Sequence, residues 1–182
     1  MFHIDSPEAL PPDLERPRSI FDLLNFRLSE FMNLSGSLVT RICEGEFGVT
    51  RNEWALIAML AAMGPSSPSE LARRTTIDRA QASKTLRVLQ AKELAVREPL
   101  PQDRRRARIR LTQRGEALFT VLFPRAVAVN QAMLSALDAG ERRQLADFLL
   151  RMHRQALEVT ASGLVEARAD RRRGGSRVNW RG

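Results

Sequence analysis

The chain has 182 residues, 43% of them apolar, which suffices for one core with a helical extension but leaves little room for two independent domains. Glycine (10) and proline (9) are sparse and aromatic residues make up 5%, so the composition excludes disordered and collagen-like proteins and favours a mainly helical one. The net charge of +8 at pH 7 suggests a polyanionic partner only if the charge is concentrated along the chain.

An arm and a long helix are predicted at the N-terminus. Residues 1–18 are rich in proline and acidic residues and lack a period, so we expect an extended arm. From Ser19, apolar residues recur every three or four positions as far as Ile42, which predicts one amphipathic helix within residues 19–48. Its apolar surface is larger than one small domain would cover, so we expect it to pack against a second helix layer or, as a dimerisation helix, against a second subunit.

Residues 49–115 predict three further helices followed by a hairpin. Gly64 and Pro65 end the first of these helices, and the second is short, from Pro68 to Arg74. The third reaches about Lys92. Each helix opens on a pair of residues with the spacing of a capping box, namely Thr50 with Glu53, Ser67 with Glu70, and Asp78 with Gln81.

The segment 94–111 alternates apolar and charged residues, which is typical of two strands. Between the strands we expect a tip that carries Arg104, Arg105 and Arg106, with Asp103 paired to one of the last two. An arginine at such a tip can enter the minor groove of DNA beside a recognition helix. A charged cover for an edge strand is the plainer alternative.

Two dimerisation helices and a tail are predicted after the hairpin. Thr112 caps the first helix, and Asp138 with Glu141 caps the second. The predicted dimerisation region is residues 116–166, so the Thr112 cap lies just before it. Residues 167–182 have no apolar face, so we expect a basic disordered tail.

The positive charge is concentrated in two segments. Residues 73–114 carry 13 basic and 4 acidic side chains, a net +9, and residues 168–182 carry 6 and 1, a net +5. The remainder of the chain is acidic. Such a distribution is typical of phosphate binding, although a solvated arginine-rich surface would give the same count.

The third helix, residues 79–92, has the pattern of a recognition helix. Ala82, Leu86 and Leu89 form its inward stripe, so the opposite side of its N-terminal half faces solvent. The major groove admits one helix, whose side chains reach base edges and phosphates. The candidate DNA contacts on this helix are Arg79, Gln81, Ser83, Lys84 and Arg87.

From about residue 20 to residue 157, the sequence resembles the MarR (multiple-antibiotic-resistance regulator) family. The resemblance is clearest in residues 69–73, in 79–89 and in 103–115, which look like the family's first motif helix, recognition helix and wing. It implies groove contacts from the recognition helix and minor-groove contact from Arg104 to Arg106. The candidate DNA contacts outside the recognition helix are Ser69, Asp103, Arg104, Arg105 and Arg106.

The resemblance also implies a homodimer, an inverted-repeat operator and a pocket for a small effector, often a phenolic or aromatic carboxylate. Glu93 stands where many relatives have glycine. A non-glycine residue in a left-handed cap destabilises the fold by about 1 kcal/mol, so one expectation is that the recognition helix ends in a different way. The candidate effector residues are Arg18, as a carboxylate partner, and Phe26, Phe31, Trp54 and Met63.

We therefore expect a mainly α fold with a small β-hairpin wing, a winged helix-turn-helix with a helical dimerisation region. The predicted function is sequence-specific binding of double-stranded DNA by a regulator, most simply a repressor that a small ligand releases. One alternative is a nonspecific architectural DNA-binding protein. Another is an oxidation-sensing regulator that uses Cys43, although Glu44 and Glu46 beside it disfavour a thiolate.

Enzymatic chemistry finds little support in the sequence. The only histidines, His3 and His153, have no metal-ligand spacing, and the chain has no glycine-rich phosphate loop or nucleophile elbow. We expect no catalytic site, metal or cofactor. The lack of a secretory signal pattern and of a run of about 18 apolar residues predicts a cytoplasmic protein that does not bind membranes.

Overall fold

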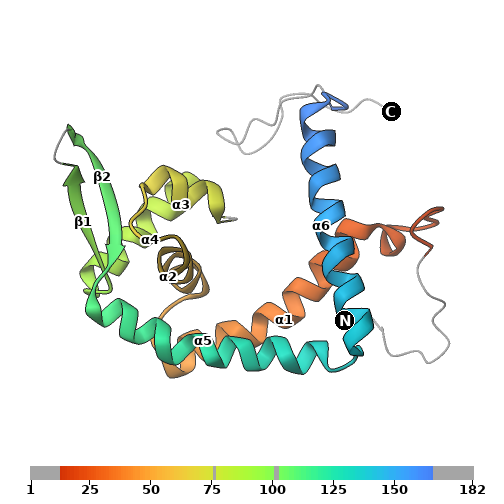
Figure 1. The fold of residues 1–182 in the computed structure, drawn as a ribbon, viewed down its shortest axis with the longest axis horizontal. Helices are drawn as coiled ribbons and strands as arrows, with labels where there is room; N and C mark the ends of the chain where they lie inside the picture. The colour runs from red at the N-terminus through yellow and green to blue at the C-terminus, as the bar shows by residue number, and fades with distance from the viewer. Residues whose placement is uncertain (1–12, 76, 101–102, 166–182) are drawn as a thin grey trace. The chain divides into compact units, whose positions relative to one another are not determined.

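The computed structural model describes residues 13–75, 77–100 and 103–165, apart from the side chains at 100 and 103–106. The chain forms two units, Met1–Met133 and Leu134–Gly182. The fold is mainly α with a two-stranded antiparallel hairpin, as predicted (Figure 1). In chain order the elements are η1 (Ile20–Asp22), α1 (Leu24–Glu46), α2 (Arg51–Met63), α3 (Pro68–Arg74), α4 (Arg79–Ala91), β1 (Ala95–Leu100), β2 (Asp103–Leu111), α5 (Gln113–Leu134) and α6 (Ala139–Ala161).

The long N-terminal helix begins later than the apolar period predicts. Residues Ile20–Asp22 form a 3-10 turn, and Leu23 is extended before α1 begins at Leu24. One carboxylate oxygen of Asp22 accepts the backbone N–H groups of Arg18 at 2.9 Å and Ser19 at 3.1 Å. These bonds close a separate turn, so the prediction of one helix from Ser19 is wrong for its first residues.

The predicted starts of α2, α3, α4 and α6 are confirmed, but not every capping box is complete. At Thr50 and at Asp138, the cap side chain and the glutamate three residues later bond in both directions. Asp78 accepts the N–H of Gln81 at 2.9 Å, while the Gln81 amide turns to Thr85 instead of returning to the cap. The Gln81 side chain therefore lies along α4 toward Thr85 and does not contact the cap residue Asp78.

Helices α2, α3 and α4 and the hairpin lie in one part of the first unit (Figure 1). A single apolar core joins them. Its wholly buried side chains come from each of these elements and from α1 and α5. Ser66, between α2 and α3, bonds to Ile109 of β2 in both directions, at 3.0 and 2.8 Å, and so ties the helix-turn-helix to the hairpin. The most buried large side chains are Val49, Leu56, Ile57, Leu71, Leu89, Ile109 and Leu122.

The hairpin differs from the predicted one at its distal end. Strand β2 begins at Asp103, so Arg104–Arg106 belong to the strand rather than to the turn. Pro99 pairs with Ala107 whereas Leu100 pairs with Asp103, so a register shift adds three residues to β2. Extra residues of this kind disrupt the ladder and bend the strand, which the alternation of side chains alone does not reveal.

Helix α4 ends in a left-handed cap at Glu93. Its φ of 59° is positive, and the N–H of Leu94 reaches the carbonyl of Leu89 at 2.9 Å while that of Glu93 reaches Gln90 at 3.0 Å. This is the Schellman pattern, which favours glycine at the left-handed residue. The helix thus ends as a glycine-capped one would, despite the glutamate.

We expect Glu93→Gly to stabilise the protein by about 1 kcal/mol, because glycine removes the Cβ strain of the left-handed cap. Glu93→Ala is the matched control, since it also removes the exposed Arg114–Glu93 ion pair of 3.7 Å but keeps the Cβ atom. Chemical denaturation measures both free energies of unfolding. A glycine variant no more stable than the alanine variant would contradict the strain argument.

Large apolar side chains remain exposed on the helices outside the winged domain. In the first unit they include Phe31 and Leu34 of α1 and Val121 of α5, and on α6 no described residue is buried. By length and composition, α5 could cross a membrane, with a mean hydropathy of 1.4 over its most apolar window. One such helix is weak evidence, because long apolar helices of soluble proteins pass the same test.

Candidate nucleic-acid interface and ligand cavity

The amphipathic pattern of α4 fixes which of its side chains face solvent. Ala82, Leu86 and Leu89 are at most 3% exposed and pack in the core, as their spacing predicts. Arg79, Ser83, Lys84 and Arg87 are all exposed. The helix therefore presents one polar, mainly basic surface to solvent, in the arrangement expected of a recognition helix.

Three acidic residues of the segment 73–114 have hydrogen-bond or ion-pair partners. Asp78 caps α4, Glu93 pairs with Arg114, and Glu98 pairs with Arg110 at 2.6 Å. Seven other basic side chains of the same segment have no hydrogen-bond or ion-pair partner within the described ranges and are solvent-exposed. They are Arg73, Arg74, Arg79, Lys84, Arg87, Arg97 and Arg108. The excess charge of residues 73–114 is thus available to phosphates.

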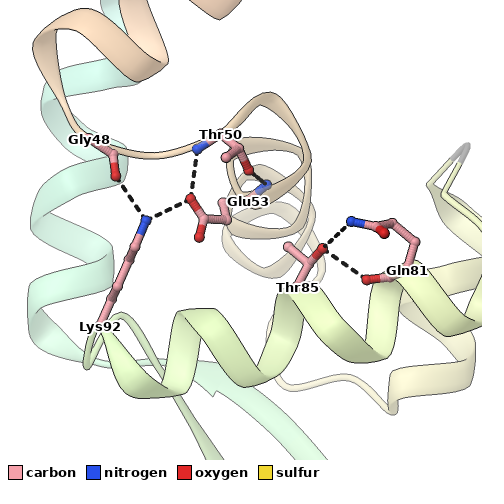
Figure 2. Close-up of polar contacts among 6 residues, drawn as sticks. All are labelled: Gly48, Thr50, Glu53, Gln81, Thr85 and Lys92. Carbon is pink, nitrogen blue, oxygen red and sulfur yellow. Dashed lines mark hydrogen bonds and ion pairs between the residues drawn. The ribbon is translucent and has the colours of Figure 1, made fainter.

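Gln81 is oriented by a neighbour that the sequence did not single out. The hydroxyl of the buried Thr85 donates to the main-chain carbonyl of Gln81 at 2.9 Å. Because its only proton is used there, it accepts from the Gln81 amide nitrogen, 3.5 Å away (Figure 2). This contact turns the amide nitrogen toward Thr85, so the Gln81 oxygen points away from it.

The other predicted DNA contacts are placed less completely. Ser69 is exposed on α3, and its hydroxyl lies 3.2 Å from that of Ser67, the N-cap of the helix. The side chains of Asp103, Arg104, Arg105 and Arg106 lie outside the described residues, although their backbone belongs to β2. The predicted pairing of Asp103 with Arg105 or Arg106 also lies outside them.

One buried carboxylate holds the end of α4 to the junction of α1 and α2. Glu53, 2% exposed, accepts the Thr50 N–H at 2.6 Å and the Lys92 ammonium at 2.9 Å through the same oxygen. The ammonium also donates to the carbonyl of Gly48 at 2.9 Å (Figure 2). The sequence predicts Glu53 as a capping residue, but its contact with Lys92, 39 residues away, has no local signal.

A cavity of about 390 Å³ that is open to solvent lies among α1, α2 and α5. Met32, Val39 and Met133 contribute to its apolar wall, and Trp54, which stacks on Phe119 at a centroid distance of 5.8 Å, adds an aromatic face. Its polar lining includes Arg51. An apolar space with an aromatic wall and one cation has the chemistry to hold a small aromatic anion.

Of the five predicted effector residues, Trp54 lines this cavity and the others do not. Arg18 is exposed before α1, and Phe31 is 55% exposed. Phe26 packs edge to face with Phe21, at a centroid distance of 5.4 Å. Met63 is half-buried at the end of α2.

Arg51 is not among the ligand-binding residues that the sequence predicts, because its position depends on packing against α1. A Cβ atom at Gly36 would lie 2.6 Å from one guanidinium nitrogen of Arg51, so the glycine leaves the space in which the guanidinium rests. A buried glycine in the middle of a long helix is the one signal that the sequence offers.

Cys43 is poorly suited to sense oxidants. The side chain is wholly buried, and burial, together with the charge of Glu44, raises the pKa of the thiol. Oxidation requires an accessible thiolate, so the structure favours a packing role for this residue.

Comparison with known proteins identifies the family. A profile described as MarR family matches residues 47–106, which run from the α1–α2 junction into β2. The putative transcriptional regulatory protein for the hcr operon of Thauera aromatica is 30% identical over 115 residues, covering 63% of this chain and 69% of that protein. The chain belongs to the MarR family.

Other MarR-type relatives agree with this assignment. The transcriptional repressor NicR of Pseudomonas putida is 33% identical over 104 residues. The match covers 57% of this chain and 66% of NicR, just under two thirds of its length. The fold also matches a solved structure of BpsR from Bordetella bronchiseptica, with a TM-score of 0.67. The DNA binding of BpsR is regulated by 6-hydroxynicotinic acid. BpsR is 22% identical, and the match covers 76% of this chain and 98% of BpsR. The family is one of transcription regulators, and NicR is named as a repressor.

Proposed function

We propose that this MarR-family protein is a cytoplasmic repressor that binds an inverted-repeat operator as a homodimer and is released by a small aromatic acid. The observation that carries the proposal is the basic surface of α3, α4 and the hairpin, where Glu93 and Glu98 are already paired with arginines and seven cations face solvent. Lys84 and Arg87 on α4 are suited to phosphates and base edges in a major groove. The hairpin would meet the adjoining minor groove through Arg104, Arg105 and Arg106.

Exposed apolar side chains support the dimer. Leu34, on α1, is 65% exposed, and Leu157, on α6, is 60% exposed, values that a second subunit would reduce. A two-fold axis then relates two copies of α4, so the operator should contain two half-sites about one helical turn apart. Light scattering is expected to give twice the chain mass, and a monomer at micromolar concentration would contradict the dimer.

The cavity among α1, α2 and α5 supports the ligand class. Arg51 would meet a carboxylate, and Trp54 would stack on an aromatic ring. 6-Hydroxynicotinic acid, named with BpsR, has both groups and is the probe that we would use first. A ligand releases DNA only if it binds the DNA-incompetent arrangement more tightly than the competent one.

Selection of bound fragments from the source genome tests the proposal. We expect the protein to enrich fragments that share one inverted repeat, and 6-hydroxynicotinic acid to release them in a footprinting assay. Enrichment of fragments without a common sequence would favour the nonspecific architectural alternative. Enrichment of one repeat without release would remove this ligand from the proposal and leave the repressor.

We expect Arg51→Gln to weaken binding of 6-hydroxynicotinic acid by roughly tenfold or more, since a charge-assisted hydrogen bond contributes about 1.5–3 kcal/mol. Gly36→Ala should act in the same direction, because its methyl group displaces the Arg51 guanidinium from its position. Isothermal titration of DNA-free protein measures both affinities. Arg41→Gln, on the exposed surface of α1, is the control for charge alone, and an equal loss in this variant would contradict the assignment.

A further inference from the structure

The ion pair between Glu53 and Lys92 does not belong to the DNA-facing surface or to the cavity lining, yet among the described residues it is the ion pair with the most buried carboxylate. The Glu53 side chain is 3% exposed, and both contacts of the Lys92 ammonium, to Glu53 and to Gly48, measure 2.9 Å. A buried carboxylate that loses its partner is strongly unfavourable, so the arrangement is held in place. We call the contacts of Lys92 with Glu53 and Gly48 the Lys92 clip (Figure 2).

The Lys92 clip joins elements with different tasks. Lys92 is the C-cap of α4, the helix with the solvent-facing cations. Glu53 lies in the first turn of α2, between Arg51 and Trp54, which line the cavity. One side chain therefore ties the end of the recognition helix to the helix turn that a ligand in the cavity would touch.

We propose that Lys92 is a positioning residue: through the clip it fixes the orientation of α4 relative to the α1–α2 junction and transmits occupation of the cavity to DNA binding. This inference rests on the proposed function, because it assumes two recognition helices that read two half-sites. The separation of the helices depends on the orientation of each, so loosening the clip widens the range of separations that the dimer can adopt.

Operators with altered half-site spacing measure this orientation directly. Adding or removing one base pair shifts a half-site by about 3.4 Å and rotates it by about 34°. We expect the wild-type protein to bind the altered operators at least about 30-fold more weakly than the selected one, and Lys92→Met to reduce this difference to about threefold. Lys92→Arg, which retains the charge and donors, should restore most of it.

A role in stability alone predicts a different outcome. Lys92→Met would then lower the melting temperature and would weaken binding to operators of every half-site spacing by the same factor. The preference for the selected spacing over the altered ones would stay at its wild-type value. This result would overturn the inference. Because Lys92→Met leaves Glu53 buried without its partner, the Glu53→Gln, Lys92→Met double variant is measured as well. Glutamine can still accept the Thr50 N–H, so the cap of α2 is retained.

Release by 6-hydroxynicotinic acid gives the second readout. Lys92 does not line the cavity, so we expect Lys92→Met and the Glu53→Gln, Lys92→Met double variant to bind the ligand with wild-type affinity when DNA is absent. Both should lose most of the change in operator Kd that the ligand causes in the wild-type protein. A wild-type protein without any spacing preference would contradict the proposed function. A wild-type preference that persists unchanged in Lys92→Met would contradict the Lys92 clip alone.

Discussion

A Lys84→Ala, Arg87→Ala double variant is expected to bind its operator at least about 100-fold more weakly than the wild-type protein at the same salt concentration. Both side chains are exposed on α4 and have no partner within the described residues, so removing them deprives each half-site of two cations. Each contact to a phosphate or base contributes about 1–3 kcal/mol at most, and a dimer loses every contact twice. Fluorescence anisotropy with the selected inverted repeat measures the affinity.

The matched control is Arg143→Ala, Arg154→Ala, which removes the same charge from exposed positions of α6. We expect it to change the affinity by less than about threefold, as the loss of distant exposed charges is screened by salt. Both variants should keep the wild-type melting temperature. An equal loss of affinity in the two variants would show that overall charge, rather than the α4 surface, drives binding.

Gly115→Ala is expected to destabilise the protein by about 3 kcal/mol or more. A Cβ atom at this position would lie 2.0 Å from the carbonyl oxygen of Leu94. The clash is with backbone, which cannot turn away as a side chain can. The same carbonyl accepts the N–H of Thr112 at 3.1 Å, so the strain would fall where α5 joins the hairpin.

Gly45→Ala, in α1, is the control for this prediction. Apart from its chain neighbours and the nearby backbone of its own helix, no atom lies within 4 Å of a Cβ there, and alanine is the better helix former. We therefore expect this variant to be as stable as wild type or up to about 1 kcal/mol more stable. Urea denaturation gives both free energies of unfolding. A Gly115→Ala protein with wild-type stability would mean that the close approach to Leu94 is absent.

The sequence predicts local features of this fold well because they depend on neighbouring residues. The caps at Thr50 and Asp138, the inward stripe of α4 and the hairpin all follow from spacings of two to four residues, and each is confirmed. The failure at Leu23 is also local: the Asp22 carboxylate competes with helix formation, and the apolar period does not register that competition.

Features that depend on distant residues were not predictable from spacing. Lys92 meets Glu53 and Gly48, and Arg51 occupies the space beside Gly36, only because the helices pack in a particular way. For the same reason the candidate aromatic residues on α1, such as Phe31, belong to the apolar pattern of the helix but lie outside the cavity. Trp54, on α2, lines it. Periodicity identifies the face of a helix, but not which neighbour covers it.

The most direct test of the DNA-reading surface is a pair of equilibrium titrations at about 150 mM salt, one with the selected inverted repeat and one with the same bases scrambled. A regulator that reads sequence through α4 and the hairpin should bind the repeat at least about 1,000-fold more tightly. Equal affinities for the two DNAs, with the same dependence on salt, would contradict sequence-specific regulation and leave only a nonspecific DNA-binding protein.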